Sequence, residues 1–117
     1  MIEEVYVSFE TAKLLKDKGF VTPCDWLYCS DGTFGHRNSL WDKEMFPAPT
    51  QQMAMRWLRE IKHIHIATEP YAGYETHSCF IWKNGMGINW QKSFHTFKTY
   101  EEACEEAIKF SIKHLIN

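Results

Sequence analysis

The sequence predicts a single α+β domain over residues 1–117, in which an antiparallel sheet of about three to five strands is packed by three helices. Asn84-Gly85, flanked by two aromatic and β-branched runs, is typical of a hairpin turn. Histidine and isoleucine alternate from His63 to Ile66, as in a half-buried strand. Three segments are amphipathic, and two of them follow capping residues, which is typical of surface helices.

The first predicted helix covers residues 9–18. Ser8 is a suitable N-cap for it, and Gly19 is a suitable stop. Its apolar side comprises Thr11, Ala12, Leu14 and Leu15, with Phe9 at the margin.

Residues 25–34 form a predicted hairpin with Asp31-Gly32 as a two-residue turn. Residues 35–48 show no clear period, so we expect a long loop there. A loop of this length is unusual in a compact domain, which indicates either a functional loop or a strand that the pattern does not reveal.

The second helix is predicted to begin near Pro49-Thr50 and to cover residues 51–62. Its expected buried side comprises Met53, Ala54, Trp57, Leu58 and Ile61. A strand over residues 63–68 follows, with its isoleucines toward the core and with His63 and His65 toward the opposite side.

The hairpin over residues 77–91 is expected to organise the sheet. If Asn84-Gly85 is a two-residue turn, Ile81 pairs with Ile88. Two positions further out, Cys79 pairs with Trp90. This apolar side is expected to face the core. The other side of the hairpin carries Ser78, Phe80, Trp82, Gly87, Asn89 and Gln91.

The last helix is predicted over residues 100–116, where Thr99 and Glu102 form a capping box. Its expected buried line comprises Tyr100, Cys104, Ala107, Ile108, Ser111 and Leu115. We expect this line to pack on the sheet.

Composition and charge exclude several classes of protein. The net charge of −2 lacks the basic excess that is typical of nucleic-acid-binding domains. No apolar run approaches the roughly 20 residues of a membrane span, and the first residues lack the pattern of a secretory signal. We therefore expect a cytoplasmic protein with no membrane partner, in which the four cysteines are reduced.

Three stretches carry a resemblance to known proteins: SFETAKLLKDKGF, APTQQMAMRWLREIKHIHI and YEEACEEAIKFSIKHLI. They resemble small uncharacterised proteins encoded by phages, prophages and mobile elements of gut anaerobic bacteria. Pro49-Thr50-Gln51 and Trp57-Leu58-Arg59-Glu60 are the most recognisable parts. The resemblance implies a small cytoplasmic protein in a bacterial host cell, and it supplies no catalytic residues.

Candidate metal ligands are too few for a predicted site. Cys24 and Cys29 are not followed by a second pair, whereas structural zinc takes four ligands. The expected register places His77 on the side opposite to His63 and His65, so these three histidines do not converge. The sequence also lacks the motifs of phosphate-binding loops and zinc proteases. We predict no catalytic residue, no metal and no cofactor.

The second side of the hairpin and the neighbouring histidines form the candidate binding surface. Its residues are Phe80, Trp82, Asn89, Gln91, His63 and His65. Aromatic rings among amides and imidazoles are typical of contact surfaces. The competing expectation, which we favour, is that a helix or the first hairpin covers these rings.

These observations predict a non-enzymatic accessory protein that binds another protein, of the host or of the phage. The first alternative is a small metal-dependent or small-molecule enzyme that uses His63 and His65. The second is weak nucleic-acid binding, for which Arg56, Arg59 and Lys62 are the candidate contacts. The oligomeric state is left open by the sequence.

Overall fold

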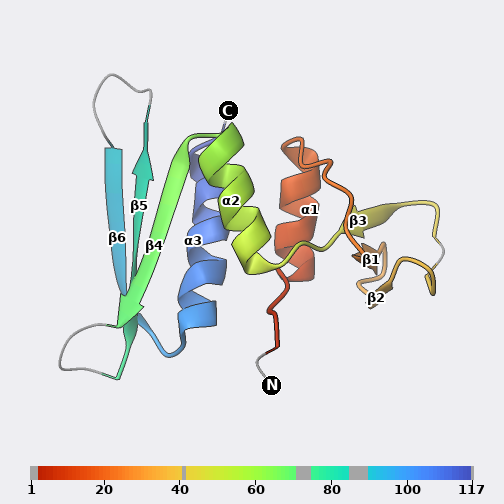
Figure 1. Ribbon diagram of the computed structural model, residues 1–117, viewed down its shortest axis with the longest axis horizontal. Coiled ribbons are helices and arrows are strands. Elements are labelled where there is room, and N and C mark those ends of the chain that lie inside the picture. Colours follow the sequence, from red (N-terminus) through yellow and green to blue (C-terminus); the bar gives the residue numbers. More distant parts are fainter. Residues whose placement is uncertain (1–2, 41, 71–74, 85–89, 117) are drawn as a thin grey trace.

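The computed structural model describes residues 3–40, 42–70, 75–84 and 90–116. The elements of this part of the chain are α1 (Phe9–Asp17), β1 (Trp26–Cys29), β2 (Phe34–His36), β3 (Met45–Pro47), α2 (Gln51–Ile61), β4 (Ile64–Pro70), β5 (His77–Lys83), β6 (Trp90–Phe97) and α3 (Tyr100–His114). The strands form two three-stranded antiparallel sheets, ordered β2-β1-β3 and β4-β5-β6. The helices lie between the sheets (Figure 1), and the predicted α+β class is confirmed.

The helix boundaries follow the predicted capping signals. Ser8 Oγ accepts a hydrogen bond from the Thr11 N–H (3.2 Å) at the start of α1. Gly19 lies just beyond the end of α1 with a φ of 97°, a conformation that glycine adopts without a steric penalty. Thr99 caps α3 in the same way, as the sequence predicts. Thr50, near the predicted start of the second helix, is the N-cap of α2.

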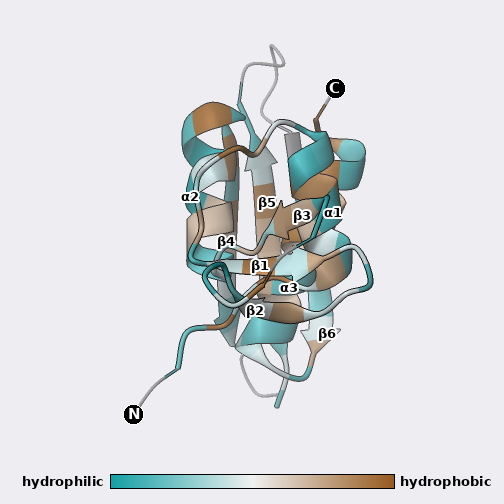
Figure 2. Ribbon diagram, turned by 90° about the vertical axis from the view of Figure 1, so that its right-hand side faces the viewer, coloured by the Kyte–Doolittle hydropathy of each residue, from teal (hydrophilic) through white to brown (hydrophobic). Residues whose placement is uncertain are grey.

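The helices are amphipathic along their lengths. Figure 2 shows hydrophobic and hydrophilic segments alternating along them, as expected when one stripe faces a core. No helix in the described ranges is both long and apolar enough to cross a membrane.

The first predicted hairpin is present, but its two-residue turn is wrong. The Cys29 N–H donates to the Thr33 carbonyl oxygen (2.8 Å), so the loop enclosed by this pair has three residues, 30–32. Gly32, the last of these, has a φ of 92°. Glycine in this left-handed position is typical of three-residue hairpin loops.

The segment over residues 35–48 contains a strand that the sequence pattern does not reveal. β3 pairs with β1 and places Phe46 opposite Tyr28. Because β3 has three residues and ends at Pro47, neither its length nor its alternation distinguishes it from a loop.

The predicted pairing of β5 is also wrong. Ile81 pairs with Lys92, and Cys79 pairs with Phe94, four positions beyond the expected partners. Residues 84–89 therefore connect β5 to β6. Met86, Gly87, Ile88 and Asn89, which the prediction assigned to the second strand, lie outside the described residues.

A contact with β4 explains why Asn84 does not open a turn. The Asn84 N–H donates to the carbonyl oxygen of His63 (3.0 Å), which continues the pairing of β4 and β5 by one step. Because a shift of four positions is even, the side chains of β5 keep the sides that the sequence predicts.

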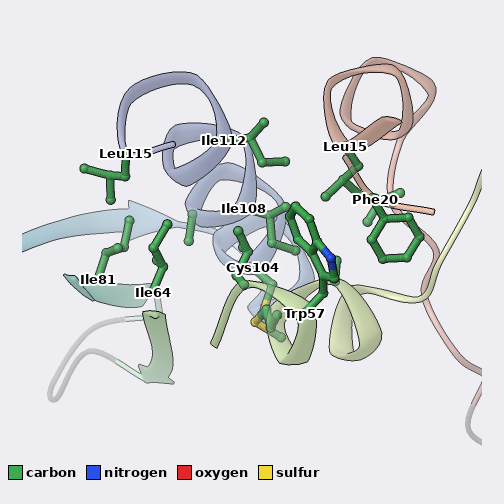
Figure 3. Close-up of a cluster of buried hydrophobic side chains, with 14 of the residues drawn as sticks. Leu15, Phe20, Trp57, Ile64, Ile81, Cys104, Ile108, Ile112 and Leu115 are labelled. Carbon is green, nitrogen blue, oxygen red and sulfur yellow. The ribbon is translucent and has the colours of Figure 1, made fainter. Parts of the chain in front are cut away.

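α3 is the central helix of the hydrophobic core (Figure 3). It contacts β4 and β5 of the second sheet, and it also contacts α1 and α2. Its buried residues are Ala103, Cys104, Ala107, Ile108, Ser111 and Ile112. The sequence prediction assumed that only one side of α3 is covered, so its expected buried residues did not include Ala103 and Ile112. It included Tyr100, which is 38% exposed at the start of α3.

α2 buries a different arc from the predicted one. Ala54, Trp57 and Leu58 are buried as expected, and Met55 joins them. Met53 and Ile61, which we expected in the core, are 41% and 58% exposed. The apolar arc of α2 is therefore wider than the side that α3 and β4 cover.

Candidate binding surface on the second sheet

The second sheet has one covered side and one side away from the helices. α2 and α3 pack on the covered side, against the fully buried side chains of Ile64, Cys79 and Ile81. Figure 1 shows no helix of the described chain on the other side, which we call the outer face. By the register, the described side chains of the outer face are His65, Ala67, Glu69, Phe80, Trp82, Ser93 and His95. Ser78 is on the same side of β5 but is buried.

Phe80 and Trp82 lie at the centre of the outer face. Their ring centroids are 6.1 Å apart and their planes differ by 25°. His95 of β6 meets the Phe80 ring edge-on, with a centroid distance of 6.2 Å. Phe80 and Trp82 are both partly buried, so the aromatic group remains accessible in part.

His65 completes this group from β4, as the sequence predicts. It lies directly opposite Trp82, and its Nε2 is 3.2 Å from Nδ2 of Asn84. This contact ties the His65 ring to the end of β5.

The other predicted surface residues are placed differently from His65. His63 precedes β4 with a φ of 59°, so the alternation of the strand does not extend to it. Gln91 pairs with Trp82 through the backbone, but its side chain lies outside the described residues. Asn89 lies outside them as well.

The histidines and cysteines do not assemble into a metal site within the described ranges, where no three His, Cys, Asp or Glu side chains are grouped to hold an ion. His77 pairs with Pro70 and Phe97 at the far end of β5. Its buried Nδ1 has no hydrogen-bond partner in the described part of the chain. The described residues thus provide no group of metal ligands for the alternative of a metal-dependent enzyme.

The two cysteines of the core are placed as structural thiols. Burial raises the pKa of Cys79 to about 11. Burial also raises the pKa of Cys104, whose Sγ lies 3.5 Å from Thr68 Oγ1. A cysteine nucleophile must ionise, so both thiols are in the unreactive form at neutral pH.

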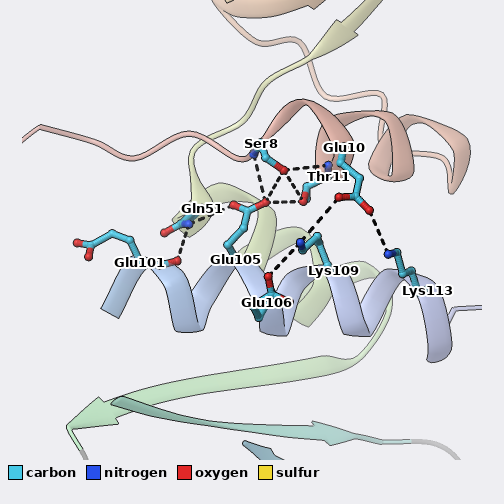
Figure 4. Close-up of polar contacts among 9 residues, drawn as sticks. All are labelled: Ser8, Glu10, Thr11, Gln51, Glu101, Glu105, Glu106, Lys109 and Lys113. Atoms are coloured by element: carbon cyan, nitrogen blue, oxygen red, sulfur yellow. Dashed lines mark hydrogen bonds and ion pairs between the residues drawn. The ribbon is translucent and has the colours of Figure 1, made fainter. Parts of the chain in front are cut away.

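The sequence reasoning missed a polar cluster between the three helices (Figure 4). Glu105 Oε2 accepts hydrogen bonds from the Ser8 N–H (3.2 Å), the Ser8 hydroxyl (2.9 Å) and the Thr11 hydroxyl. Glu105 Oε1 accepts from Gln51 Nε2 (3.2 Å), which also donates to the Glu101 carbonyl oxygen (2.9 Å). The cluster therefore joins α1, α2 and α3.

This cluster has a structural role. A carboxylate at the first turn of α1 satisfies free backbone and hydroxyl donors and interacts favourably with the helix dipole. The hydroxyl groups of Ser8 and Thr11 both donate to the Glu105 carboxylate, which holds them in place between the helices. The capping pattern at Ser8 is visible in the sequence, but the approach of Glu105 depends on how the helices pack.

Comparisons with protein-family models, curated proteins and solved structures found no match for this chain. The resemblance to phage-encoded proteins therefore stays a prediction.

Proposed function

We propose that this chain is a non-enzymatic accessory protein that binds another protein through the outer face of the second sheet. One observation carries the proposal: Phe80 and Trp82 lie together on a face that no described helix covers. The expected covering of these rings by a helix or by the first hairpin is not seen among the described elements, since both lie on the other side of the sheet.

The composition of the outer face supports protein binding. Two large aromatic side chains occupy its centre, and His65, Ser93 and His95 surround them. Aromatic anchors with a polar rim are typical of protein interfaces.

The charges of the outer face do not favour the nucleic-acid alternative. Its described residues include no lysine or arginine, and Glu69 adds a negative charge. Nucleic-acid affinity depends mainly on basic contacts to phosphate. A protein partner fits this face better than a nucleic acid does.

The size of the outer face suggests what the partner presents. Strands of seven, seven and eight residues cover roughly 300 Å² at about 3.3 Å per residue and 4.8 Å between strands. A standard interface buries about 800 Å² on each partner. We infer that a short segment of a host or phage protein docks here, with Phe80 and Trp82 as its main contacts.

Affinity capture from host cells tests this proposal. A Phe80→Ser/Trp82→Ser variant should lose a protein that the unmodified chain captures. A Tyr100→Ser variant is the matched control, because Tyr100 is a partly exposed ring at the start of α3. Equal capture by all three proteins, or capture of no protein above background, would contradict the proposal. Thermal unfolding of each variant checks that the fold is retained.

A further inference from the structure

The surface beside α2 carries a second apolar region, distinct from the outer face. Val21, Ile61 and Met53 are 83%, 58% and 41% exposed. They border a hollow of about 440 Å³, together with Trp57. We define the α2 patch as Val21, Met53, Arg56, Trp57, Glu60 and Ile61.

The apolar residues of α2 in this patch lie in one row along the helix. Met53, Trp57 and Ile61 follow one another at intervals of four residues. Met53 and Ile61 are exposed, whereas Trp57 between them belongs to the core and is 9% exposed. Rows of this kind on two helices interdigitate most often at a crossing angle of about −50°. A second α2 is therefore a suitable occupant for the hollow beside this row.

The charges of the α2 patch are self-complementary. Arg56 Nε lies 3.2 Å from Glu60 Oε1, so the patch has one charge of each sign in a fixed order along α2. A two-fold axis reverses this order in the second copy and brings Arg56 of each copy toward Glu60 of the other. An isologous interface requires this property, whereas a strongly acidic or basic partner would call for a patch of net charge.

We propose that the α2 patch joins two copies of this chain in an antiparallel dimer, with the two-fold axis near Trp57. The three exposed apolar side chains give a small contact compared with the about 800 Å² that a standard interface buries on each partner. The dimer is therefore weak, with a Kd of about micromolar or higher. This inference does not depend on the outer face or on its partner.

Sedimentation equilibrium over a wide range of protein concentrations tests the dimer. The average mass should rise from the monomer mass of 13.9 kDa toward twice that value. The Phe80→Ser/Trp82→Ser variant should show the same rise, because its substitutions are on another surface.

Charge reversal makes the test specific for the proposed geometry. In the proposed dimer, position 56 of each copy faces position 60 of the other copy. Arg56→Glu or Glu60→Arg alone therefore places like charges at both of these contacts and should weaken self-association roughly tenfold. An equimolar mixture of these two variants should associate again, because each copy then meets opposite charges. The double variant, Arg56→Glu/Glu60→Arg, should behave like the unmodified chain.

Three outcomes would overturn the inference. The mass of the unmodified chain could stay at 13.9 kDa at the highest concentration, in which case the α2 patch does not join two copies. Self-association could survive both single reversals unchanged, which would place the interface elsewhere. The mixture of the two variants could fail to associate although each variant remains folded by its melting curve, which would exclude the antiparallel arrangement.

Discussion

At the residue scale, Glu105 does the most to connect the helices. Its carboxylate accepts from Ser8 and Thr11 at the start of α1 and from Gln51 at the start of α2. Hydrogen bonds to a charged acceptor are stronger than those between neutral groups. A single side chain of α3 thus joins the starts of the other two helices to α3.

Replacement of Glu105 should destabilise the fold. Glu105→Ala leaves the donors of Ser8, Thr11 and Gln51 without their acceptor, which we expect to lower the free energy of unfolding by about 1–3 kcal/mol. Urea unfolding measures this loss. Glu106→Ala is the control, because Glu106 pairs with Lys109 at the surface and should change stability by less than about 0.5 kcal/mol. Equal losses in the two variants would refute the role of Glu105.

The buried thiols give a second prediction at this scale. Burial holds the pKa of Cys79 at about 11, above its ordinary value of 9.0. The folded chain therefore favours the protonated thiol. The stability that this burial contributes is fully present below about pH 9 and is lost as the pH rises toward 11.

Thiol labelling at pH 8 should follow burial. Cys24 is partly exposed and should react in the folded protein, whereas Cys79 and Cys104 are buried and should react after denaturation. Mass spectrometry of the labelled peptides identifies the sites. Labelling of Cys79 at the same rate as Cys24 in the folded state would contradict the burial of this thiol.

At the element scale, α3 and α2 differ in how much of their apolar surface is covered. α3 is covered on two sides, so Ile112 is fully buried. α2 contacts β4 and α3, but Ile61 at its end is exposed. The same residue type should therefore contribute differently in the two helices.

Two isoleucine substitutions compare these environments. Ile112→Ala should lower the free energy of unfolding by about 2–5 kcal/mol, because it leaves a cavity in the core. Ile61→Ala should change it by about 0.5 kcal/mol or less. Denaturant unfolding of the two variants provides the comparison, and similar losses would show that α2 is packed differently.

The elements that local signals define could be predicted from the sequence. Ser8, Thr50 and Thr99 mark the starts of the helices, since each cap involves residues within one turn. The register of β5 and β6 could not be predicted, because Asn84 pairs with His63, 21 positions earlier in the chain. β3 is too short to show a period.

Part of the candidate surface could also be predicted, because side-chain alternation along a strand is a local signal. Side-chain alternation places His65, Phe80 and Trp82 on one face, and the even register shift leaves that assignment intact. Whether a helix covers the face depends on which side α2 and α3 pack. The amphipathic pattern of a helix identifies its buried stripe but not the sheet side that receives it.

At the scale of the whole molecule, the two sheets and the three helices leave different surfaces for different roles. The helices fill the space between the sheets (Figure 1) and bury one side of β4, β5 and β6. The outer face and the α2 patch remain on separate surfaces. On our two proposals, the partner protein and the second copy therefore bind to different surfaces.

Site-specific photo-crosslinking tests the proposed function most directly. A benzoylphenylalanine at position 82 should, on irradiation in host cells, form a covalent adduct with one partner protein. The same group at position 34, where Phe34 is exposed on β2 at the other end of the molecule, should not form this adduct. The same adducts at both positions, or no adduct at position 82, would contradict the assignment of the outer face as the binding surface.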